Sequence, residues 1–153
     1  MQRSTHPIEI LLGFAAGLII ALVVEQPLVW FLHQAGLTAR HAFSTQPTAP
    51  MAVEAVWSRV FWGGVYGIGL AWFGTRYELG SRWFVASMVF AAGIRTLLDW
   101  FVLPMFWGHV WAGATADGIV VPLVLNVVWA AGTAAVLAVF TLALGTWGSE
   151  TLT

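Results

Sequence analysis

The stretch IEILLGFAAGLIIALVVEQPLVWFL, residues 8–32, decides the fold class of this chain. A helix needs about 20 mostly apolar residues to cross about 30 Å of hydrocarbon, and this stretch is long enough to do so. The apolar core of a signal peptide is much shorter, about 7–15 residues, and ends at a small-x-small cleavage site that does not follow closely here. We therefore expect a retained transmembrane helix.

Three further stretches have a similar length and apolar character, at residues 53–74, 83–107 and 119–145. The alternating pattern of the strands of a membrane barrel, each about 10 residues long, is not seen. The sequence therefore predicts an all-α integral membrane protein. Its four transmembrane helices form an up-down bundle and a single domain over residues 1–153.

The composition narrows the classes of partner and cofactor. Apolar residues make up 59% of the chain and charged residues only 8%, against about 25% charged residues in an average soluble domain. The net charge is −1, with no lysine and no basic patch, so we expect no nucleic acid as a partner. The absence of cysteine excludes thiolate metal sites. The histidines lie outside the predicted spans, so they do not supply the two facing imidazoles of a bundle haem. We expect neither a metal nor a cofactor.

The arginines in the predicted loops indicate the orientation. Arg3, Arg76 and Arg82 fall on the side of the N-terminus and the second loop, whereas the other side has Arg40 alone. Because basic loop residues stay on the cytoplasmic side, we expect both termini in the cytoplasm. Tryptophans near both predicted interfaces are typical of the aromatic belts that anchor helices in the lipid bilayer.

Charged and polar residues inside the spans are the candidate site. They are Glu25, Arg59, Arg95, Asp99 and Asn126. A charge near the centre of a transmembrane helix costs about 2.5–3.5 kcal/mol on insertion scales, so each needs a partner. At 1.5 Å per residue, most of these residues fall roughly 9–12 Å from the outer ends of their helices, which predicts one polar layer. We expect Arg95 to pair with Asp99 one turn along its own helix, and Glu25 to pair with Arg59 of the adjacent helix.

Small residues at a spacing of four run into these polar residues on each predicted helix. The candidates for helix packing are Gly13, Gly17, Gly63, Gly67, Ala91, Ala130 and Ala134. Residues four apart share one face of a helix, and small residues on such a face allow close approach of helix backbones in a membrane. The polar residues are therefore predicted to point at neighbouring helices and away from lipid.

Pro27 interrupts the first predicted helix just after Glu25. A proline inside a helix removes a backbone donor and displaces the carbonyl four residues earlier, which here belongs to Val23. We expect a weakened helix and additional polarity at the level of Glu25.

The run Phe61-Trp62-Gly63-Gly64-Val65-Tyr66-Gly67 resembles a group of uncharacterised small bacterial four-helix inner-membrane proteins. Further pieces that agree are Glu25-Gln26 before Leu32-His33, and Phe43-Ser44 with Pro47 and Pro50. This chain has Glu25 where the group often has histidine. The resemblance implies a bacterial origin and a multi-pass location in the cell inner membrane, and it brings no activity with it.

These observations favour a small inner-membrane protein without catalytic chemistry of its own. It would act as a structural or accessory subunit bound to another membrane protein, or as a homo-oligomer. One alternative is a proton-coupled small-solute transporter or channel that uses Glu25 and Asp99, because intramembrane acids often mark proton and ion sites. A weaker alternative is a membrane enzyme acting on lipid or quinone near His33 and His109.

Overall fold

The computed structural model of the protein describes residues 7–48, 52–74, 80–102 and 116–144. Several features of the sequence analysis lie outside these residues: Arg3, Pro50, Arg76, His109, residues 103–107 of the third predicted span and residue 145 of the fourth. The elements follow in the order α1 (Pro7–Ile20), η1 (Ala21–Glu25), α2 (Gln26–Gln34), β1 (Pro47–Thr48), β2 (Val53–Glu54), α3 (Ala55–Gly74), α4 (Ser81–Leu97), η2 (Leu98–Val102) and α6 (Ala116–Ala143).

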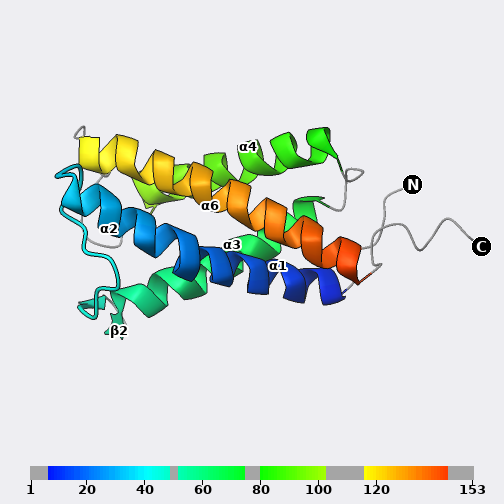
Figure 1. The fold of residues 1–153 in the computed structure, drawn as a ribbon, viewed down its shortest axis with the longest axis horizontal. Coiled ribbons are helices and arrows are strands. Elements are labelled where there is room, and N and C mark those ends of the chain that lie inside the picture. The colour runs from blue at the N-terminus through cyan, green and yellow to red at the C-terminus, as the bar shows by residue number, and fades with distance from the viewer. Residues whose placement is uncertain (1–6, 49–51, 75–79, 103–115, 145–153) are drawn as a thin grey trace, which may run out of the picture.

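The described residues form four helical rods that run alternately up and down (Figure 1). The first rod joins α1, η1 and α2 without a break, and the third joins α4 and η2. We call the end where α2 ends and α3 and α6 begin the loop end of the bundle. The start of α1 and the end of α6 lie at the opposite end (Figure 1).

Three of the rods are long and apolar enough to cross a membrane: Pro7–Gln34, Ser81–Val102 and Asp117–Ala143. They correspond to the first, third and fourth predicted spans. The second predicted span forms α3, a 20-residue helix. Its mean hydropathy is lowered by five glycines, three tryptophans and Arg59, so it does not belong to this set.

The closest packing in the bundle is between α1 and α3, where backbone meets backbone. A methyl group added to Gly17 would overlap the carbonyl oxygen of Gly63, and one added to Gly67 would overlap the carbonyl oxygen of Gly13. A methyl group on Gly63 would lie 2.6 Å from Cβ of Ala21. Only glycine allows this crossing, because any side chain at these points would force the two helices apart.

The core between the rods combines small residues with two large aromatic side chains. Ala91, Ala130 and Ala134 are buried in it, together with Trp83 and Trp129. The indole Nε1 of Trp129 donates a hydrogen bond of 3.1 Å to the carbonyl oxygen of Gly17. Trp129 thereby ties α6 to α1 in the middle of the bundle.

The segment between α2 and α3 folds back onto the loop end. The N–H of Phe43 donates to Oε1 of Gln26 at 2.9 Å, and the Thr38 hydroxyl donates to the carboxylate of Asp117 at the start of α6. Strands β1 and β2 form a two-residue antiparallel pair, Pro47 with Glu54 and Thr48 with Val53, so residues 53 and 54 of the second predicted span lie in a strand and not in the helix. These bonds hold the loop against α2, α3 and α6.

Candidate functional site

A buried ion pair between Glu25 and Arg95 lies in the centre of the candidate site. Glu25 is the last residue of η1, and Arg95 lies in the last turn of α4. Nη2 of Arg95 donates to both carboxylate oxygens of Glu25, at 3.0 Å to Oε1 and 2.9 Å to Oε2. The two side chains are only 8% and 5% exposed. Hydrogen bonds between ionised partners are about twice as strong as neutral ones, so this contact neutralises both charges inside the bundle.

Two aromatic rings lie beside the Arg95 guanidinium. Its Cζ lies 4.7 Å from the ring centroid of Trp129 on α6 and 5.5 Å from that of Tyr66 on α3. A guanidinium at such a distance is attracted by the negative face of an aromatic ring. The Nε and Nη1 groups donate to no acceptor among the described residues, so the rings supply part of what hydrogen bonds would otherwise provide. Arg95 therefore contacts side chains from three other rods.

A second set of hydrogen-bonded polar side chains joins α6 to the end of α4 and to η2. The side-chain amide of Asn126 donates to Oγ1 of Thr96 at 3.1 Å and to Oδ2 of Asp99 at 2.8 Å. Asn126 is 1% exposed and Thr96 is 3% exposed, whereas Asp99 is half-buried. Asp99 thus lies next to a neutral donor and closer to the bundle surface than Glu25.

The predicted pairing within the polar layer is wrong in both cases. Glu25 pairs with Arg95 and not with Arg59, and Asp99 accepts from Asn126 and not from Arg95. The reason is burial: an i,i+4 pair of Arg95 with Asp99 would leave the carboxylate of Glu25 in the core without a cation. A buried lone charge costs far more than a half-buried one beside a polar donor, so Arg95 reaches across the bundle to the deeper acid.

Arg59 lies apart from this pair. It is half-buried in the second turn of α3, and its guanidinium forms no salt bridge with any described residue. The structure thus brings Glu25 together with Arg95, and Asn126 together with Asp99. It leaves Arg59 beside the layer without a direct partner in the described ranges.

Glu25 and Asp99 both lie in π-helical turns. Glu25 ends η1, and Asp99 is the second residue of η2. Trp129 donates to the carbonyl oxygen of Gly17, one turn before η1 begins at Ala21, and Pro27, just after η1, offers no N–H to the carbonyl of Val23. The sequence analysis singled out Pro27 but not the hydrogen bond from Trp129 to Gly17. Such π turns occur frequently at functional sites.

Sequence reasoning missed several contributors to the site. Trp129 and Tyr66 contact Arg95, and Thr96 bonds to Asn126. A signal existed for Trp129, which lies one turn after Asn126 and so shares its face. Glu9 is a further missed acid; it is 2% exposed in the first turn of α1, at the end of the bundle away from the loop.

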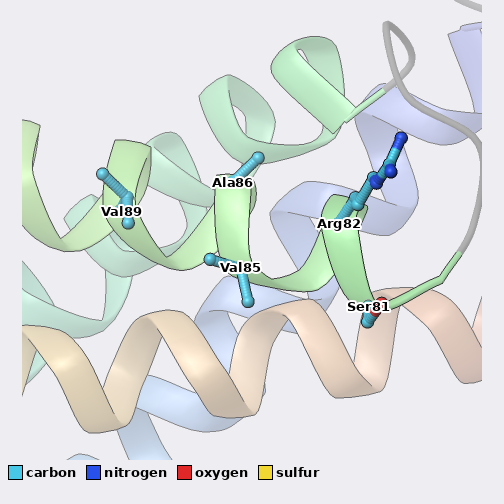
Figure 2. A pocket seen from close by; sticks show the side chains of 5 residues that line it. All are labelled: Ser81, Arg82, Val85, Ala86 and Val89. Atoms are coloured by element: carbon cyan, nitrogen blue, oxygen red, sulfur yellow. The ribbon is translucent and has the colours of Figure 1, made fainter.

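Two surface depressions formed by described residues lie away from the ion pair. One is a shallow apolar depression on α4 near its start, lined by Ser81, Arg82, Val85, Ala86 and Val89 (Figure 2). Another is lined by Leu32, Leu37, Val120, Val121 and Val124 at the loop end. Neither is lined by a residue of the polar layer.

The histidine at the loop end is bonded within the loop: Nδ1 of His33 lies 3.0 Å from the carbonyl oxygen of Thr38. Within the described ranges, no three His, Asp or Glu side chains are grouped as metal ligands.

Comparisons with known proteins give no further assignment of this site. No protein-family model, no curated protein and no solved structure matches the chain. The chemistry of the described side chains is therefore the basis for any functional conclusion.

Proposed function

We propose that the chain is a small multi-pass protein of a bacterial inner membrane, with four spans and both termini in the cytoplasm. In this proposal it acts as a non-catalytic structural or accessory subunit of a membrane complex, or as a homo-oligomer. Three apolar rods support the membrane location. The fourth span is supported by α3, whose 20 residues cover about 30 Å at 1.5 Å per residue, enough for a bilayer, and which packs closely along α1.

The proposed structural role rests on one observation: both side chains of the Glu25–Arg95 pair are almost fully buried among the described residues. Both oxygens of Glu25 are bound by Arg95, whose guanidinium lies beside the rings of Trp129 and Tyr66. A solute or proton site in use would need a wet, accessible carboxylate, whereas this one is 4% exposed. The pair is suited to fix which helices lie side by side.

Buried ion pairs contribute more to specificity than to stability in several proteins. In this bundle, the pair joins the first rod to the third, and Arg95 also contacts α3 and α6 through the two rings. An alternative helix order would separate Glu25 from Arg95 and leave two buried charges unpaired. We infer that this cost selects one arrangement of four otherwise similar apolar helices.

The experiment that tests the structural role is purification in a mild detergent, followed by light scattering of the eluted protein. We expect a stable complex, either with a second membrane protein or with further copies of the chain. Glu25→Gln should lower accumulation of the chain in membranes, and Glu25→Gln combined with Arg95→Gln should restore part of it. A wild-type chain that elutes as a single monodisperse monomer contradicts the proposal.

The π turns at both acids favour a second candidate, a proton-coupled transporter or channel that uses Glu25 and Asp99. Rearrangement of a π turn to an α turn would rotate the acid relative to its neighbours, and π turns are often retained at functional sites. This candidate predicts proton flux into liposomes containing the purified chain. It also predicts that Glu25→Gln abolishes the flux while the protein stays folded. A folded Glu25→Gln variant with wild-type flux would contradict it.

A further inference from the structure

Two histidine rings lie side by side at the loop end of the bundle. His33 belongs to the last turn of α2, and His41 lies in the loop that follows α2. Their ring centroids are 4.3 Å apart, and the ring planes are tilted by 51°. His33 is half-buried and His41 is exposed, so an ion in solution can reach the pair.

A tight turn after α2 brings the two histidines together, although they lie eight positions apart in the sequence. Gly36 has a left-handed φ of 71°, and its N–H donates to the carbonyl oxygen of His33 at 3.0 Å. A glycine in this conformation commonly ends a helix, and here the chain beyond it returns past His33. The sequence analysis looked for histidines inside the spans and did not anticipate this pair.

The ring of His33 is held in an orientation that leaves one nitrogen available. Its Nδ1 lies 3.0 Å from the carbonyl oxygen of Thr38. Because a carbonyl oxygen only accepts, Nδ1 carries the hydrogen, and the lone pair of the neutral ring is on Nε2. Metal-binding histidines commonly show this arrangement, in which a bond to a backbone carbonyl fixes the ring and the other nitrogen binds the metal.

The loop that carries His41 is fixed to the rest of the bundle on both sides of it. Before His41, the Thr38 hydroxyl donates to the carboxylate of Asp117 at the start of α6. After it, the N–H of Phe43 donates to Oε1 of Gln26 at 2.9 Å. An ion that binds the pair therefore orders little additional chain, which lowers the entropy cost of binding.

The charges next to the pair allow a cation to bind. Arg40 precedes His41 in the sequence, but the carboxylate of Asp117 is bound to the same loop, at the Thr38 hydroxyl and, at 3.4 Å, at the N–H of Ala39. The pair also lies at the C-terminal end of α2, where the partial negative charge of the helix favours a cation.

We propose that His33 and His41 bind a divalent transition-metal ion of the kind that imidazole prefers: Zn²⁺, Ni²⁺ or Cu²⁺. A ring nitrogen lies about 1 Å from its ring centroid and a metal–nitrogen bond is about 2.0–2.1 Å long, so one ion can bridge rings whose centroids are up to roughly 6 Å apart. The observed separation of 4.3 Å is within this limit. Water fills the other coordination positions, because no third His, Asp or Glu is grouped with the pair among the described residues. The site does not involve the Glu25–Arg95 pair, so it stands or falls separately from the proposed function.

Titration of the detergent-solubilised full chain with Cu²⁺ tests the proposal. The chain is purified without a histidine tag. Binding is followed by calorimetry and by electron paramagnetic resonance of the bound ion, whose spectrum reports the number of nitrogen ligands. We expect one ion per chain with two imidazole nitrogens. His33→Gln and His41→Gln should each lower the affinity by about tenfold or more, since even losing an outer partner of a metal ligand costs that much, and each should leave one nitrogen ligand.

The matched control is His6→Gln, which changes a histidine that precedes the start of α1 in the sequence and should alter neither the affinity nor the number of nitrogen ligands. A wild type that binds no Cu²⁺ overturns the proposal. Equal binding in the wild type and both variants also overturns it, as does an equal loss in His6→Gln. Should His33→Gln disturb the loop by losing its bond to Thr38, His41→Gln decides alone, because the His41 side chain is exposed.

Discussion

Replacing Glu25 by glutamine and Arg95 by methionine, singly and together, measures the strength of the central ion pair. Each single replacement removes one ionised partner and leaves the other in the core, at 8% or 5% side-chain exposure. Breaking a buried pair in this way costs about 3–5 kcal/mol in soluble proteins. We expect losses of this size in the free energy of unfolding for Glu25→Gln, because the charged Arg95 remains.

The double variant removes both charges, so its loss in the free energy of unfolding should be smaller than the sum of the losses of the two single variants. It still loses the attraction of the guanidinium to Trp129 and Tyr66, about 1–2 kcal/mol for a desolvated cation on aromatic rings. The interaction between the two positions in the cycle should therefore be about 2–4 kcal/mol. The same cycle between Glu25 and Arg59 should give less than about 1 kcal/mol, since no salt bridge joins them.

The measurement is unfolding of the purified chain by sodium dodecyl sulfate in mixed micelles, followed by tryptophan fluorescence. Each variant is compared with the wild type at the same detergent composition. The reasoning is refuted if Glu25 interacts more strongly with Arg59 than with Arg95. It is also refuted if the interaction between Glu25 and Arg95 falls below about 0.5 kcal/mol, the range found for independent sites.

Three further predictions use the same unfolding assay or proteolysis. Gly17→Ala should destabilise the protein by about 1–3 kcal/mol through overpacking, because its methyl group would meet the α3 backbone. The control is Gly93→Ala, where a methyl group meets open space; its stability should stay within about 1 kcal/mol of the wild type. Equal losses of stability in the two variants would contradict the observed helix crossing. Asn126→Leu should lower the free energy of unfolding by about 1–3 kcal/mol, because it leaves Asp99 without its donor. The double variant Asn126→Leu with Asp99→Asn should recover part of that loss. No recovery would contradict an energetic coupling between the two residues. Gln26→Leu should speed cleavage of the loop between α2 and α3 by an added protease, since it removes the acceptor for the loop backbone, and an unchanged cleavage rate would show that this bond does not hold the loop.

Much of the fold was predictable because lipid imposes simple rules on a chain. Long apolar stretches must form helices in which every backbone group is satisfied internally, and the described helices occupy the four predicted stretches with shifts of a few residues at their ends. Small residues also marked the contact of α1 with α3, where Gly13 and Gly17 meet Gly63 and Gly67. Whether α3 itself crosses a membrane stays a prediction, since its glycines and tryptophans leave it outside the apolar set.

The pairing within the polar layer was not predictable, because spacing along one helix says nothing of how deeply each charge is buried. Asp99 lies four residues after Arg95, an arrangement that favours a local pair, yet the depth of Glu25 in the core directed Arg95 across the bundle. Trp129 shares a helix face with Asn126, but nothing in the sequence indicated its hydrogen bond to the Gly17 carbonyl.

The sequence by itself determined that this chain forms apolar helices with a few charges inside them, because apolar length and lone charges have one meaning in a membrane. Only the tertiary structure decided which charge meets which, because a flexible arginine side chain can reach several acids at similar depth. The arginine pairs with the acid whose burial without a partner would cost the most free energy, and that cost depends on how deeply the other helices bury each acid. In this protein that acid is Glu25, and the Arg95 guanidinium that binds it also lies beside the rings of Trp129 and Tyr66.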